Sequence, residues 1–195
     1  LVRSRGLGDV YKRQVYDASR KDKAYDIIEI TNPAPGYPKG FLIVGSNTNA
    51  TCCTLLCYAV RIDTAGDTLW TREYSHPLYE WTGLVHGMQE IHKVIWAGNE
   101  PYQTKFMLMA YTAYPESLRE EYAMWLLQIS DTLRGDTIWT KTYDKYVSTF
   151  PRDITLCDDG GYAIAGFVRD PVLLPGGSLG ALWLLRVDSL GNNLP

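Results

Sequence analysis

A nine-residue pattern recurs along the chain and limits the folds that it can adopt. Two copies, beginning at Gly66 and Gly135, read Gly-Asp-Thr, then Leu or Ile, Trp-Thr, a basic residue, any residue and Tyr. Their tryptophans, Trp70 and Trp139, are 69 residues apart, and a third copy begins at Gly191. Such internal self-similarity is the sequence signature of a repeat architecture, in which each unit packs against its neighbours. The chain is therefore expected to consist of stacked structural repeats.

Each repeat contains four short runs rich in Val, Ile, Trp and Tyr, separated by Gly, Asp, Asn and Pro. This alternation of apolar runs and turn residues predicts β-strands. Each repeat also has an apolar run that ends in Gly, and we place these runs at 41–45, 94–98 and 162–166. Because they are apolar on consecutive residues, the runs suit strands buried on both faces. The sequence predicts an all-β chain, a β-propeller fragment of about three four-stranded antiparallel blades. An open β-array is the alternative.

Glycine and tryptophan mark the repeated turns and strands. A tight turn often needs the positive φ that Gly adopts without strain. A repeat unit of this kind cannot bury its apolar faces alone, so the Trp rings are expected to fill the wedge between blades. Stacking on a ligand is the alternative for these rings. The residues given structural roles are Gly66, Trp70, Trp125, Gly135, Trp139, Trp183 and Gly191.

We divide the chain into five segments. Residues 1–14 have four basic residues against one acid and no strand or helix pattern, so we interpret them as a non-native scar. A native basic arm is the alternative. Residues 15–23 are a linker or the end of a preceding blade. The blades are expected at 24–75, at 76–144 with a long insertion at 99–121, and at 145–195, truncated before its last strand.

Two segments of the third repeat carry a resemblance to a known family. Residues 159–166 read Asp-Gly-Gly-Tyr-Ala-Ile-Ala-Gly, and residues 182–192 read Leu-Trp-Leu-Leu-Arg-Val-Asp-Ser-Leu-Gly-Asn. Over about residues 24–194 the chain resembles β-propeller repeat proteins of the secreted or surface Bacteroidetes type. Residues 1–14 resemble adapter-derived sequence at the end of a metagenomic fragment. The resemblance implies an extracellular or cell-surface location, with the remaining blades of a parent chain as partners.

A second likeness concerns a motif within the repeat. Asp131, Gly135 and Trp139 have a four-plus-four spacing that is similar to the tryptophan-docking motif of quinoprotein propellers. In that family the motif is structural, because the Trp packs against a neighbouring blade. The vicinal pair Cys52-Cys53 also has a counterpart in such enzymes, but the surrounding sequence does not match. No quinone cofactor is therefore inferred.

Composition and motif spacing narrow the possible chemistry. The chain has 19 Lys and Arg against 22 Asp and Glu, a net charge of −3, which gives no electrostatic case for nucleic-acid binding. No apolar run approaches the roughly 18 residues of a membrane-spanning helix. The cysteines lack zinc-ligand spacing, and their pairing is left open. His76, His86 and His92 lack acidic neighbours at ligand spacing. We predict no catalytic residue, metal site or cofactor. The cysteines are Cys52, Cys53, Cys57 and Cys157.

A binding face is predicted from loop lengths. In a four-stranded blade, the loops between the second and third strands emerge on one face, and here they vary in length while the following turns are short. Insertions gathered on one face are typical of a binding face. Tolerated length variation is the alternative. The candidate contact residues are Tyr102, Gln103, Tyr114, Glu116, Arg119, Arg169 and Asp170.

The leading functional hypothesis is a non-catalytic binding or scaffold module within an extracellular or cell-surface β-propeller. Its partner is expected to be a protein or a glycan. The alternatives are part of a propeller enzyme acting on polysaccharide, as hydrolase or lyase, or a quinoprotein-like propeller. Two catalytic carboxylates on separate blades would leave no local sequence signature, so the sequence does not separate these classes.

Overall fold

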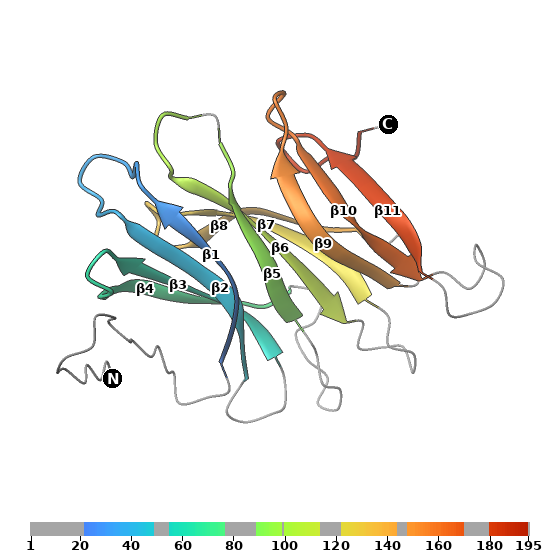
Figure 1. Ribbon diagram of the computed structural model, residues 1–195, viewed down its shortest axis with the longest axis horizontal. Coiled ribbons are helices and arrows are strands. Elements are labelled where there is room, and N and C mark those ends of the chain that lie inside the picture. Colours follow the sequence, from blue (N-terminus) through green and yellow to red (C-terminus); the bar gives the residue numbers. More distant parts are fainter. Residues whose placement is uncertain are drawn as a thin grey trace, which may run out of the picture.

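The computed structural model describes residues 22–48, 55–76, 89–98, 100–113, 122–143, 148–169 and 180–194, which form eleven β-strands and no helix (Figure 1). The first group of strands is β1 (Lys23–Ile30), β2 (Gly40–Thr48), β3 (Leu55–Asp63) and β4 (Thr68–Tyr74). The second is β5 (Gln89–Trp96), β6 (Lys105–Ala113), β7 (Tyr122–Ser130) and β8 (Asp136–Tyr143). The third is β9 (Ser148–Leu156), β10 (Tyr162–Arg169) and β11 (Ala181–Val187).

Each group forms its own antiparallel sheet, in which strands pair only with their neighbours in the sequence. The orders are β1-β2-β3-β4, β5-β6-β7-β8 and β9-β10-β11, and we call these sheets blades 1, 2 and 3. The first strands of successive blades lie side by side, β1 beside β5 and β5 beside β9. Figure 1 shows the blades fanning out from these inner strands. The predicted fold class, an all-β propeller fragment of about three antiparallel blades, is confirmed.

Blade 2 corrects the predicted strand positions. The expected long insertion at 99–121 is wrong for residues 105–113, because they form β6, a central strand with both faces buried. In blades 1 and 3, Gly45 and Gly166 pair with the aromatic residue of the next strand. In blade 2 the residue paired with Trp125 is Ala110, not Gly98. The run expected at 94–98 instead contains the end of β5.

In blades 1 and 2, the tryptophan of the repeat packs on the turn glycine of the following repeat. A Cβ atom added to Gly135 would lie 2.8 Å from the Trp70 ring, and Gly135 has a φ of +79°. Tyr74 donates a hydrogen bond to the Gly135 carbonyl at 2.9 Å. Trp139 covers Gly191 in the same way, with its ring 2.9 Å from the added Cβ. Because each contact joins consecutive blades, the Gly-to-Tyr repeat fixes one blade against the next.

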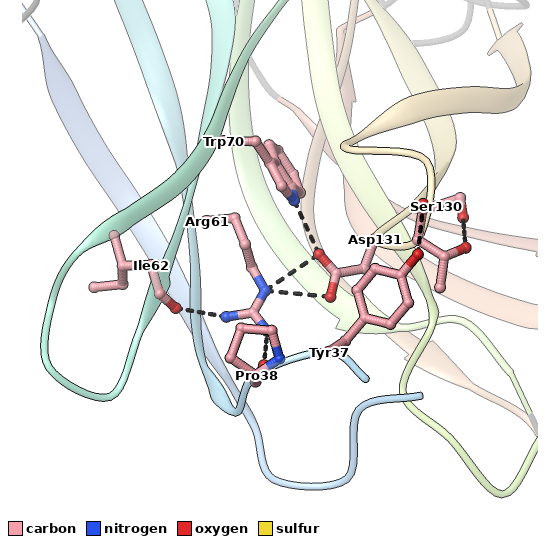
Figure 2. Close-up of polar contacts among 8 residues, drawn as sticks. Tyr37, Pro38, Arg61, Ile62, Trp70, Ser130 and Asp131 are labelled. Atoms are coloured by element: carbon pink, nitrogen blue, oxygen red, sulfur yellow. Dashed lines mark hydrogen bonds and ion pairs between the residues drawn. The ribbon is translucent and has the colours of Figure 1, made fainter. Parts of the chain in front are cut away.

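A buried ion pair reinforces the contact between blades 1 and 2. The Arg61 guanidinium on β3 lies 3.2 Å from the carboxylate of Asp131, and both side chains are almost fully buried. Trp70 donates its indole N–H to the same carboxylate at 3.0 Å. Figure 2 shows these side chains converging on Asp131. One acid therefore holds two residues of the preceding blade.

Each blade also presents an alternating row of side chains from its third strand to the blade that follows. In blades 1 and 2 these rows are buried in the two apolar cores between the blades. In blade 3 the corresponding row is open, with Leu182 90% exposed and Leu184 68% exposed. The rows are Cys57, Ala59 and Arg61; Met124, Leu126 and Gln128; and Leu182, Leu184 and Arg186.

Candidate functional site

The inner strand of every blade has a β-bulge at the same register. In blade 1 the pairing passes from Ala24 with Gly45 to Asp26 with Val44, so Tyr25 is the extra residue. The same shift occurs in the other two blades, opposite Ala110 and Gly166. A bulge takes one side chain out of the ladder and re-aims it, and bulges are enriched beside functional sites. The extra residues are Tyr25, His92 and Arg152.

Glycine makes room for the bulged strand. A Cβ atom on Gly45 would collide with the carbonyl oxygen of Lys23, and one on Gly166 would collide with that of Phe150. This close approach explains why the apolar runs of blades 1 and 3 end in Gly, since only Gly lacks a Cβ. We call the end of the blades where the inner strands begin the bulge end. The opposite end, which carries Gly135 and Gly191, is the turn end.

Two of the bulge residues, Tyr25 and His92, belong to a band of rings that crosses all three blades. Tyr25 stacks on His92 of the next blade at 4.7 Å, and His92 stacks on Tyr111 at 4.8 Å. Tyr122 continues the band with an edge contact to Tyr111, and it reaches blade 3 at Phe150, 5.1 Å away. The aromatic band is Tyr25, His92, Tyr111, Tyr122, Phe150 and Phe167.

Blade 3 ends the band with two arginines. Phe150 and Phe167 stack with their centroids 4.7 Å apart and their planes at 15°. The Arg152 guanidinium lies 5.1 Å from the centre of Phe167, and that of Arg169 lies 5.4 Å from the centre of Phe150. These distances fit cation–π contacts, which favour Arg over aromatic faces. Both arginines are exposed, so their N–H groups remain accessible.

Glu90 is the acid beneath the band. Its carboxylate accepts hydrogen bonds from Tyr25 at 2.7 Å and from Tyr111 at 2.5 Å, and it lies 3.4 Å from His92 and 3.5 Å from Lys23. Burial alone would raise the pKa of Glu90. The hydrogen bonds from His92, Tyr111 and Tyr25 and the charge of Lys23 outweigh burial and lower the pKa to about 2. Glu90 therefore stays ionised and holds the rings in place.

The same carboxylate affects the tyrosines that bind it. Burial and the hydrogen bond to Glu90 raise the pKa of Tyr25 and of Tyr111 above their usual value. Both phenols are therefore protonated donors near neutral pH. Two further hydroxyls at this end, those of Ser46 and Thr112, are buried and have no hydrogen-bond partner in the described part of the chain. The bulge end thus combines fixed donors, rings and exposed cations.

The candidate contact residues predicted from the sequence do not all lie at the same end of the blades. Arg169 lies over the Phe150 ring of the aromatic band, at the bulge end. Tyr102 and Gln103 lie at the turn end, between β5 and β6, where the Gln103 side-chain oxygen accepts backbone N–H groups of Thr31 and Asn32 at 2.8 and 2.9 Å. These two residues therefore do not join Arg169 in one site. Tyr114, Glu116, Arg119 and Asp170 lie outside the described residues.

Most of the band was missed by the sequence interpretation. That interpretation assigned no catalytic or metal-binding role to His92, and no role at all to Tyr25 and Arg152. The signal that could have found them is the Gly at the end of the apolar run, because it marks the residue opposite the bulge. In blade 2 that signal is absent, since Ala110 occupies the position.

The remaining chemical candidates do not form a site in the described part of the chain. No group of three or more potential metal ligands occurs among these residues. Cys57 and Cys157 are free thiols, and burial raises the pKa of Cys57. His76 contacts Thr142 at 2.5 Å, and burial lowers the pKa of His76.

The described residues also hold no helix with the length and apolar character that a membrane crossing needs. Cys52, Cys53 and His86 lie outside the described residues.

No protein-family model matches this chain, and no curated protein is found to be similar to it.

Proposed function

We propose that the chain is a non-catalytic binding module whose ligand is a glycan bound at the bulge end. The single observation that carries this proposal is the aromatic band, which runs across three blades and includes the bulge residues Tyr25 and His92. Aromatic rings offer flat apolar faces with little loss of side-chain freedom on binding. Sugar rings, with apolar C–H faces and hydroxyl edges, suit such a surface.

The electrostatics of the site support binding rather than catalysis. Hydrolysis of a glycosidic bond by the common mechanism uses two carboxyl groups, one of which needs a raised pKa to act as an acid. Glu90 has the opposite character, because its pKa is lowered to about 2 and its oxygens already accept two phenol groups. Glu90 therefore acts as an anchor for the rings.

The test uses the whole chain on an array of immobilised oligosaccharides from neutral and acidic polysaccharides. The Tyr25→Ala variant removes a band residue that is 38% exposed, and Tyr102→Ala removes a tyrosine that is 40% exposed at the turn end. We expect Tyr25→Ala to weaken binding about tenfold, while Tyr102→Ala binds like the original chain. A tenfold change corresponds to about 1.4 kcal/mol, which lies at the upper end of the range for one aromatic stacking contact.

Three outcomes would overturn the proposal. Absence of binding to every oligosaccharide would contradict a glycan ligand. Loss of binding in Tyr102→Ala but not in Tyr25→Ala would move the site to the turn end. Shortened oligosaccharides after incubation with the chain would show that it is an enzyme.

A further inference from the structure

Arg152 and Arg169 differ from most of the other basic residues of the strands. Arg61, Arg72, Lys93, Lys105 and Arg186 each lie within ion-pair distance of a carboxylate. Arg152 and Arg169 have rings as neighbours instead, and neither has a carboxylate partner in the part of the chain that the structure describes. A guanidinium that stacks on a ring keeps its N–H donors at its edge, where they can bind a carboxylate in the bidentate manner.

The ring pair beneath these arginines preorganises their side chains for binding. Phe150 and Phe167 face each other across β9 and β10 and stack nearly in parallel. The rings limit the freedom of the two long side chains before any ligand arrives, which lowers the entropy cost of binding. Arg169 is the last residue of β10, at the bulge end, and Arg152 is the bulge residue of β9, so both guanidinium groups lie beside the band.

A comparison of equivalent positions in the three blades shows which blade carries the positive charge at the bulge end. At the position of Phe150, blade 1 has Lys23 and blade 2 has Glu90. The charge of Glu90 is buried, with the Lys23 ammonium 3.5 Å away and the hydroxyls of Tyr25 and Tyr111 as hydrogen-bond donors. Arg152 and Arg169 are cations at this end without a carboxylate partner among the described residues, although the chain as a whole has a net charge of −3. A local positive patch on an acidic chain attracts anionic ligands selectively.

We propose that the ligand is an anionic saccharide, a sugar chain with carboxylate groups, which Arg152 and Arg169 bind while the aromatic band stacks on the sugar faces. This inference rests on the proposed glycan-binding function and specifies its ligand. An acidic peptide would use the two arginines but would leave the rings of blades 1 and 2 without a role. A neutral saccharide would use the rings but leave both guanidinium groups unpaired.

The experiment is isothermal titration of the whole chain with three probes: a galacturonate oligomer, a cello-oligosaccharide and a poly-glutamate peptide. We expect the galacturonate oligomer to bind at least tenfold more tightly than the other two. Arg152→Gln and Arg169→Gln should each weaken galacturonate binding about fivefold to tenfold, and cello-oligosaccharide binding should not change. Arg134→Gln removes an exposed arginine at the turn end and serves as the matched control.

The outcomes separate this inference from the function on which it rests. If both saccharides bind equally and the arginine variants match the original chain, the anionic ligand is wrong and the glycan-binding function stands. If poly-glutamate binds as tightly as galacturonate, the saccharide class is wrong. If neither saccharide binds, the anionic ligand is wrong, and the oligosaccharide array decides whether the glycan-binding function also fails. Unchanged circular dichroism spectra and melting temperatures of the variants show that each change in affinity is local.

Discussion

The buried Arg61–Asp131 pair allows a quantitative prediction about how the blades are held together. The two Asp131 oxygens accept from the Arg61 Nε at 3.2 and 3.3 Å, and one of them also accepts the Trp70 indole N–H at 3.0 Å. The remaining Arg61 nitrogens donate to the backbone carbonyls of Ile62 and Pro38 (Figure 2). Asp131→Ala therefore leaves a buried guanidinium without its counter-ion and an indole N–H without an acceptor.

The magnitude follows from burial. Removing one partner of a buried ion pair costs about 3–5 kcal/mol, because the other charge stays buried and uncompensated. For a chain of 195 residues, each kcal/mol lowers Tm by roughly 2–4 °C, so Asp131→Ala should lower Tm by roughly 6–20 °C. Arg61→Met/Asp131→Ala removes both charges and should recover a large part of that loss. Thermal unfolding followed by circular dichroism, with urea unfolding as a second measurement, gives these values.

Arg186→Met is the matched control. Arg186 occupies the position of Arg61 in blade 3, but its contact with Asp159 is exposed, and exposed ion pairs contribute about 0–1 kcal/mol. The reasoning is refuted if Asp131→Ala lowers Tm by no more than Arg186→Met does. It is also refuted if the loss of Tm in the double variant equals the sum of the losses in Arg61→Met and in Asp131→Ala. The two residues would then not be coupled.

Three further predictions concern other parts of the molecule. Gly135→Ala should cost about 2 kcal/mol or more in urea unfolding, from strain at positive φ and a clash with Trp70, whereas Gly36→Ala, with similar φ but open space, should cost about 1. Because the pKa of Glu90 is lowered on folding, its stabilisation is present above the ordinary value near 4.5 and is lost as the pH falls towards 2. Urea unfolding between pH 6 and pH 2.5 should therefore show a smaller loss for Glu90→Gln than for the original chain, and equal losses would contradict the role of Glu90. The open row of blade 3 exposes apolar side chains and should cause self-association at high concentration, measured by analytical ultracentrifugation. Leu184→Thr should reduce this association without lowering Tm, and a chain that stays monomeric, or an unchanged association, would contradict the prediction.

The sequence was sufficient for the features that depend on local chemistry. Gly66, Gly135 and Gly191 adopt positive φ in turns, as the repeat pattern predicts. The strand order within each blade also follows from short connections between adjacent strands. The second strand of blade 2 was misplaced, because Ala110 takes the position where the other blades have Gly, and Gly98 offered a false match.

The candidate site was hidden for a different physical reason. A bulge is a relation between two strands, so no property of Tyr25, His92 or Arg152 alone marks it. The three residues are also chemically unlike one another, which prevents recognition as a repeat. Only the pairing register of each inner strand with the second strand of its blade shows that the three residues occupy equivalent positions.

Side chains repeat from blade to blade at the turn end but differ at the bulge end, and this difference has a structural cause. At the turn end, Trp70 and Trp139 must each fit the space above a glycine, so the side chains there repeat from blade to blade. At the bulge end, the extra residue leaves the ladder and its side chain does not enter the packing of the glycine and tryptophan contacts. Its identity can therefore change without loss of the contacts that join the blades. A fold of this kind can vary its binding chemistry at one end while the other end preserves its stability, and the sequence differences among Tyr25, His92 and Arg152 follow this division.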